Sequence, residues 1–347
     1  MLYTTLVMFL SCTNDKAADS ATSIDEPSET ETGENDSTDS PVVFAASDVD
    51  QSSIDRTLEW FGVADDAWYT EDSFGWGQYD PVYLVLVGED MQATIELEQR
   101  YCDYLNEHHP DSVEYSLCNP NYTDPNCQEG ICMFTEYVTN GGAAIASSRQ
   151  NDGYHLMITA AKNPSPQEDD YKRVVLHESF HIYQLSQHTE TDYDTVNEIQ
   201  GRRSGDHNED VPWWMEGVAE YMAIMLYAKQ DGVRADYAQQ EFRYKIGYYD
   251  ENSGTPVIDE YFALETKLYN ITYGEDAWLA YSLGAWFVAY LINEHGEQAL
   301  FDFYQELNAR TFDDNFSTQF GKDHRQIVTD FETFLQQDPS QLISIIP

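Results

Sequence analysis

Basic residues are scarce in this chain of 347 residues, which has 17 Lys and Arg against 63 Asp and Glu and a formal net charge of −46 at pH 7. Contacts to a phosphate backbone depend on Lys and Arg, so this balance excludes nucleic acid as a partner. Two interpretations of the acidity stay open. We favour a solvated surface suited to salt-rich surroundings over a surface that attracts cationic substrates.

The amino-terminal segment MLYTTLVMFLSC has an apolar run that is too short for a stable transmembrane helix and that ends at Cys12. It resembles a bacterial lipoprotein signal, which implies export and a lipid anchor on Cys12 at the cell envelope or cell surface. It departs from that pattern because no Lys or Arg precedes the run and Phe9 replaces the usual Leu. We expect contact with a membrane only through this anchor.

Paired Cys-x-x-Cys motifs are also missing. Apart from Cys12, the cysteines are Cys102, Cys118, Cys127 and Cys132. An even number in a loop-like, Asn- and Pro-rich stretch favours two disulfides in an oxidising compartment over a second zinc site. Four cysteines allow three pairings, of which we favour Cys102–Cys118 with Cys127–Cys132.

Large apolar residues are rare in residues 13–50, where Ser, Thr, Asp, Glu and Gly dominate. Such a stretch cannot bury enough surface to offset its chain entropy, so we expect a disordered acidic tether after the signal segment, residues 1–12. The remaining residues are numerous enough for a full core in one or two lobes.

The sequence His177-Glu178-Ser179-Phe180-His181 is an H-E-x-x-H motif. Residues four apart lie on one face of a helix, so His177 and His181 can hold one metal ion from the same side. Glu178 lies about 100° further round the helix, where its carboxylate can take a proton from a water without being a ligand. The motif therefore favours metal-assisted hydrolysis.

The surrounding sequence favours a helix. Val174, Val175, Ile182 and Leu185 recur at helical spacings around the motif. The stretch opens with Ser165-Pro166-Gln167-Glu168, a capping-box pattern with Pro at the first helical position.

Metzincin peptidases continue this motif on the same helix as H-E-x-x-H-x-x-G-x-x-H. Here Gln184 and Gln187 stand at the Gly and third His positions, and His188 misses the register by one residue. We interpret His188 as a solvated helix-end histidine, stabilised by the helix dipole, and not as a ligand.

A third ligand candidate lies in the segment VPWWMEGVAEYMAIMLYAK (211–229). Pro212 suits a helix start, so Glu216 projects from the first turns of an apolar helix, and Glu220 lies one turn further on the same face. A carboxylate among apolar side chains needs a partner. A metal ion for Glu216 and the N–H of a ligand histidine for Glu220 would meet that need. Surface glutamates on an amphipathic helix are the weaker interpretation.

This pattern resembles the gluzincin metallopeptidases, the group that includes thermolysin and aminopeptidase N. It is most similar to the aminopeptidase-like branch, whose third ligand sits in a W-x-x-E-G-x-A segment, here 213–219. The resemblance implies one Zn²⁺ per chain bound by His177, His181 and Glu216, with Glu178 as the general base and Glu220 orienting a ligand histidine.

The chain departs from the gluzincin pattern in two places. The 34 residues between His181 and Glu216 exceed the family's spacing, which indicates an insertion at about 189–211. The substrate-amine motif G-x-M-E-N is not visible, and NGGAA (140–144) is at best a remnant in its position. The resemblance therefore implies zinc chemistry without implying aminopeptidase specificity.

The segment AYSLGAWFVAYLINEHG resembles the helix that carries the oxyanion-stabilising tyrosine in this group. By position that residue is Tyr281, whose phenol can donate a hydrogen bond to an oxyanion. A packing role for Tyr281 stays open, because the chain has 25 Tyr. Tyr269 and Tyr273, just before it, are the next candidates.

Hydrophobic patterning predicts strands at 81–88, 131–138 and 154–161. The resemblance to gluzincins implies an edge strand that lies along the cleft, and the run at 154–161 is our candidate for it. It also predicts helices near 212–230, 275–295, 297–309 and 323–337, with helix ends at Gly296 and Gly321. We therefore expect an α+β, zincin-like fold. Its sheet-bearing lobe (51–211) has the HExxH helix at the junction with a helical lobe (212–347).

The sequence thus predicts an exported zinc peptidase that acts on a peptide or protein substrate. Two alternatives stay open: a catalytically inactive, peptidase-like binding lipoprotein, and a zinc hydrolase of non-peptide amides or esters. A structural Ca²⁺ in the acidic segment SGDHNEDVP (204–212) is a minor expectation, since the spacing fits no EF-hand and Val211 replaces the turn Gly. The sequence carries no signal of oligomeric state.

Overall fold

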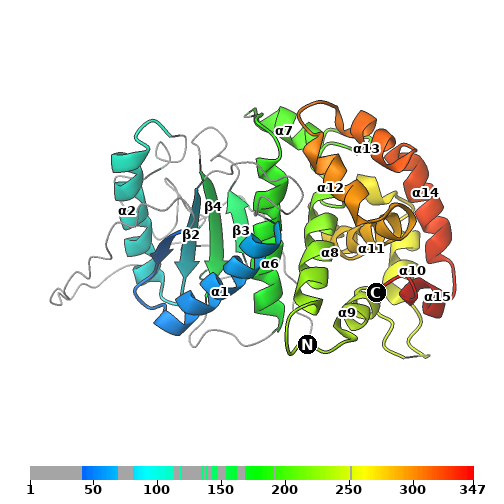
Figure 1. The fold of residues 1–347 in the computed structure, drawn as a ribbon, viewed down its shortest axis with the longest axis horizontal. Helices are drawn as coiled ribbons and strands as arrows, with labels where there is room; N and C mark the ends of the chain where they lie inside the picture. Colours follow the sequence, from blue (N-terminus) through cyan, green and yellow to red (C-terminus); the bar gives the residue numbers. More distant parts are fainter. Residues whose placement is uncertain are drawn as a thin grey trace.

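The architecture combines a small mixed sheet with a larger set of helices, in agreement with the α+β class expected from the sequence (Figure 1). The computed structural model describes residues 41–68, 81–112, 118, 134–135, 138, 143–146, 154–161, 169–190, 192–250 and 252–347.

The sheet-bearing part contains β1 (Val42–Ala45), α1 (Gln51–Trp68), β2 (Val82–Val87), α2 (Met91–His108), β3 (Ala143–Ala146), β4 (His155–Ala160) and α6 (Asp169–Ser186). The part that follows contains α7 (Tyr193–Ile199), α8 (Met215–Ala228), α9 (Tyr237–Lys245), α10 (Pro256–Ala263), the 3-10 helix η1 (Leu268–Asn270), α11 (Ala277–His295), α12 (Glu297–Gln305), α13 (Phe312–Phe320), α14 (His324–Leu335) and α15 (Pro339–Ile343).

The described strands form one sheet in the order β1-β2-β4-β3, in which β1, β2 and β4 are parallel and β3 is antiparallel to β4. Every residue of β2 is buried, because helices cover both faces of the sheet. The first four side chains of β2 alternate between two cores, with Val82 and Leu84 on the side of α1 and α6, and Tyr83 and Val85 on the side of α2.

Helix α6, which carries the HExxH motif, lies between the sheet and the helical part (Figure 1). It contacts α1, β3 and β4 on one side and α8 on the other. Its apolar residues Val175, Leu176, Phe180 and Ile182 are fully buried in the larger core. The periodicity seen in the sequence therefore reflects a helix that is covered on nearly all sides.

The expectation that 154–161 would be the edge strand is wrong, because the edges of the sheet among the described strands are β1 and β3. That run forms β4, which is hydrogen-bonded on both sides, to β2 and to β3. Its continuous apolar character is that of an interior strand buried on both faces.

Two other expectations are wrong in part. Residues 42–45, which we placed in the tether, form β1 and pair with β2. The sequence pattern at 131–138 predicted a strand, but the described residues of this stretch, Phe134, Thr135 and Val138, are helical. The signal segment, most of the tether and the capping box at 165–168 lie outside the described residues.

Other expected elements are present. The run at 81–88 forms β2, and the four expected helices correspond to α8, α11, α12 and α14. Gly296 and Gly321 end α11 and α13, each with positive φ. Cys102 and Cys118 form the expected disulfide, whereas Cys12, Cys127 and Cys132 lie outside the described residues. No helix in the described part of the chain has both the length and the apolar character needed to span a bilayer.

Helices α8 and α11 cross in close contact at two glycines. A Cβ on Gly284 would lie 2.3 Å from the carbonyl oxygen of Trp213, and a Cβ on Gly217 would lie 2.5 Å from the carbonyl carbon of Gly284. Backbone atoms cannot move aside as flexible side chains do, so only glycine fits at this crossing. The crossing fixes the first turn of α8 against the first half of α11.

We expect Gly284→Ala to lower the free energy of unfolding by about 1–3 kcal/mol, because the added methyl group forces the two helices apart. Urea denaturation followed by circular dichroism would measure the change. Gly62→Ala on α1 is the matched control, since its Cβ meets no atom within 4 Å and Ala favours a helix by up to about 1 kcal/mol. Equal stability of Gly284→Ala and the wild-type protein would contradict the proposed crossing.

Candidate metal centre

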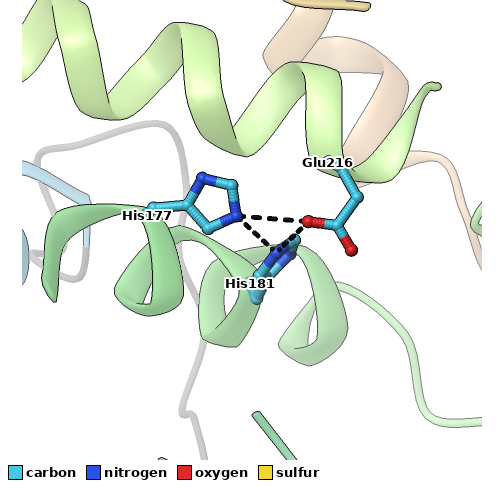
Figure 2. A group of neighbouring side chains, drawn as sticks. All are labelled: His177, His181 and Glu216. Atoms are coloured by element: carbon cyan, nitrogen blue, oxygen red, sulfur yellow. Dashed lines mark hydrogen bonds and ion pairs between the residues drawn. The ribbon is translucent and has the colours of Figure 1, made fainter. Parts of the chain in front are cut away.

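Three side chains from two helices converge at the junction between α6 and α8 (Figure 2). His177 and His181 lie one turn apart on α6, and Glu216 projects toward them from the first turn of α8. Helix α8 begins at Met215, slightly after the expected start at Pro212, and the N–H of Glu216 donates to the carbonyl of Pro212 at 3.0 Å. The structure thus brings together the three residues that the sequence predicted as ligands.

The three candidate ligand atoms form a nearly equilateral triangle. The Nε2 atoms of His177 and His181 are 3.0 Å apart, and Glu216 Oε2 lies 3.2 Å from the first and 3.1 Å from the second. Ligand atoms of a tetrahedral zinc ion, with bonds of about 2.0–2.2 Å, lie about 3.3 Å from one another. Both histidines are buried, and Glu216 is partly buried.

Each histidine directs its other ring nitrogen to a separate acceptor. His177 Nδ1 lies 3.0 Å from Glu220 Oε2, and His181 Nδ1 lies 2.6 Å from Gln184 Oε1. The amide nitrogen of Gln184 donates to the carbonyl of Met215 at 2.9 Å, which identifies Oε1 as the acceptor. Both Nδ1 atoms therefore carry hydrogen.

With hydrogen on both Nδ1 atoms, the two neutral imidazoles present lone pairs at Nε2. Together with Glu216 Oε2, three acceptors then face one another with no hydrogen atom among them, an arrangement that needs a cation. A proton can serve as that cation when it binds to His177. Burial alone would lower the pKa of His177, but the hydrogen bonds to Glu216 and Glu220 outweigh the effect of burial and raise this pKa to about 10. The group can therefore hold a metal ion.

Glu220 belongs to a buried charged network behind His177. Its Oε1 accepts a hydrogen bond from Lys245 Nζ at 2.6 Å and lies 3.9 Å from Arg173 Nε, and Arg173 also pairs with Glu241. Burial alone would raise the pKa of Glu220, yet the charges of Lys245 and Arg173 and the contact with His177 hold it well below its usual range. Glu220 is therefore a carboxylate that orients His177 and favours charge on it.

Gln184 orients His181, as Glu220 orients His177. The sequence did not lead us to predict this role. This fully buried side chain accepts from His181 and donates to both the Met215 carbonyl and the Tyr304 hydroxyl, the latter at 2.8 Å. The spacing in the sequence could have indicated this role, because Gln184 lies three positions after His181 and therefore on the same face of the helix.

Glu178 lies within electrostatic reach of the same group. It is only 8% exposed, and burial raises its pKa, while the nearby His177 and His181 act in the opposite direction. For Glu216, burial also opposes ionisation, but contacts with both histidines hold its pKa well below its usual range. The site therefore contains one ionised ligand carboxylate and one carboxyl group that burial makes more basic.

Two tyrosines approach the group from the region around the start of α11. The Tyr273 hydroxyl donates to Glu216 Oε1 at 3.0 Å. The Tyr281 hydroxyl is buried and has no hydrogen-bond partner among the described residues. Burial, followed by the charges of Glu216 and Glu178, raises the pKa of Tyr281 well above its usual value, so Tyr281 remains a neutral donor close to the site.

Two sequence interpretations need correction here. His188 is buried, at 7% exposed, and is not a solvated histidine. The acidic segment at 204–212 pairs with arginines instead of forming a calcium-type cluster: Asp210 contacts Arg202 and Arg203, and Asp206 contacts Arg325. Within the described ranges, the only cluster with metal-ligand geometry is the His-His-Glu group.

No protein-family model matches the chain, and no curated protein matches it.

We expect the purified protein to bind one divalent metal ion per chain and to lose it when His181 or Glu216 is changed to Ala, because each change removes one of three ligand atoms. Mass-spectrometric metal analysis after dialysis would measure the occupancy. His295→Ala, an exposed histidine at the end of α11, should leave it unchanged. Full occupancy in a His177→Ala/His181→Ala protein would contradict the assignment.

Proposed function

We propose that this protein is a zinc-dependent peptidase of the gluzincin type, with a zincin-like arrangement of its sheet and HExxH helix. The observation that carries the proposal is the convergence of three buried acceptors, His177 Nε2, His181 Nε2 and Glu216 Oε2, beside the carboxyl group of Glu178. Two histidines and one carboxylate are a ligand set of hydrolytic zinc sites, and a carboxyl group next to them is the expected base.

Zinc bound to these ligands supplies Lewis acidity, which lowers the pKa of a water molecule to about 7. Glu178 takes the proton of the attacking water, and its raised pKa makes it a stronger base than an exposed glutamate. The same carboxyl group then gives the proton to the leaving amine. Tyr281, whose hydroxyl has no hydrogen-bond partner in the described part of the chain, donates that hydroxyl to the carbonyl oxygen of the substrate as the oxygen gains negative charge.

A peptide fits this site better than a small amide or ester because of the strand next to α6. Among the described strands, β3 is the antiparallel edge of the sheet, and it contacts α6. An edge strand offers backbone N–H and C=O groups in the register that an extended peptide needs. The specificity for peptides therefore comes from main-chain pairing along β3.

We expect Glu178→Gln to lower hydrolysis by about two to four orders of magnitude while metal content and unfolding temperature stay at the wild-type level, because the amide cannot accept the water proton. A library of quenched fluorogenic peptides would measure the rate, and Glu198→Gln on the surface is the matched control. Wild-type hydrolysis in Glu178→Gln would place the base elsewhere. A wild-type protein that binds zinc but cleaves no peptide would favour the binding-protein alternative.

Changing Tyr281 to Phe should lower kcat by roughly 10²–10³ with KM nearly unchanged, because the hydroxyl is needed mainly in the transition state. Steady-state kinetics on the best peptide of the library would separate the two constants. Tyr290→Phe, which removes a hydroxyl further along α11, should behave as wild type. A wild-type kcat in Tyr281→Phe would make Tyr281 a packing residue.

A further inference from the structure

The two carboxylate oxygens of Glu216 have different surroundings. Oε2 faces the Nε2 atoms of both histidines, at 3.2 and 3.1 Å, whereas Oε1 accepts a hydrogen bond from the Tyr273 hydroxyl at 3.0 Å. One oxygen is thus directed into the metal group and the other is engaged by a phenol outside it.

This division matters because a glutamate can bind a metal through one oxygen or through both. A hydrogen bond to Oε1 occupies one of its lone pairs and fixes the rotation of the carboxylate, which leaves Oε2 as the ligand atom. It also fixes a long side chain that otherwise loses rotamer entropy when it binds a metal. A partner at Oε1 therefore organises the ligand before the metal arrives.

Tyr273 is itself held in place from its other side. The Arg202 guanidinium lies over its ring, with 5.3 Å between the guanidinium carbon and the ring centroid. Arg202 is anchored by Asp210 at 3.5 Å and by the Val211 N–H, which donates to its carbonyl at 2.9 Å. The ring is therefore fixed between the arginine and the carboxylate of Glu216.

We propose that Tyr273 is a positioning residue of the metal centre, which holds Glu216 so that Oε2 alone faces the histidines and thereby sets the affinity and coordination of the metal. This inference rests on the metal centre proposed above. It also assigns different roles to the two tyrosines: the Tyr273 hydroxyl contacts Glu216, whereas the Tyr281 hydroxyl contacts no polar group of the described residues.

The test is a metal titration of three proteins: wild type, Tyr273→Phe and Tyr269→Phe. Tyr269 is a matched control because it also lies under an arginine, Arg325, at 5.5 Å, and makes no hydrogen bond to a ligand. Metal-free protein is titrated with Zn²⁺ against a chromophoric chelator. The same proteins are loaded with Co²⁺, whose visible absorption reports the geometry and number of its ligands.

We expect Tyr273→Phe to bind Zn²⁺ about 10–100-fold more weakly and to alter the Co²⁺ absorption band, because Glu216 loses its fixed orientation. Tyr269→Phe should match wild type in both measurements. In a Glu216→Ala background, Tyr273→Phe should have no further effect on the remaining affinity, since the group it positions is gone.

Wild-type affinity and an unchanged Co²⁺ spectrum in Tyr273→Phe would overturn the positioning role. Equal losses in Tyr273→Phe and Tyr269→Phe, or an undiminished effect in the Glu216→Ala background, would overturn it too, because they would assign the loss to packing. A wild-type protein that takes up neither Zn²⁺ nor Co²⁺ would instead show that the metal centre itself is wrong.

Discussion

The close contact between Gly217 and Gly284 is the constraint on which the site depends. Gly217 follows Glu216 directly on α8, and Gly284 lies one turn after Tyr281 on the same face of α11. The approach of two backbones without side chains between them therefore fixes the distance between Glu216 and Tyr281. Because α6 packs against α8 as well, the same crossing places both histidines relative to the rest of the site.

The two histidines are held by partners of different charge, and this difference shapes the electrostatics of the centre. Behind His177 stands Glu220, which pairs with Lys245 and Arg173, and Arg173 also pairs with Glu241, so the two carboxylates and two cations of this network balance. Behind His181 stands the neutral amide of Gln184, which the Met215 carbonyl and the Tyr304 hydroxyl orient. Two anionic partners in addition to Glu216 would leave excess negative charge in a buried site, at a large desolvation cost.

The sequence predicted the parts of the site that depend on local spacing. His177, His181 and Glu220 follow from helical periodicity, and Glu216 follows from a carboxylate at the start of an apolar helix that needs a partner. It did not predict contacts between distant segments, such as Lys245 with Glu220, because no local pattern records them. In the sheet, β2 and β4 were visible as apolar runs, but the order of the strands was not, since burial on both faces looks alike in any interior strand.

Residues 189–211, which connect α6 to α8, contact residues whose side chains support the His-His-Glu group. Gln200 donates to the backbone carbonyl of Gln184 at 2.6 Å, and Arg202 lies over the ring of Tyr273. One contact is thus made with Gln184, the partner of His181, and the other with Tyr273, the partner of Glu216. This connection therefore supports the side chains around the His-His-Glu group from two sides.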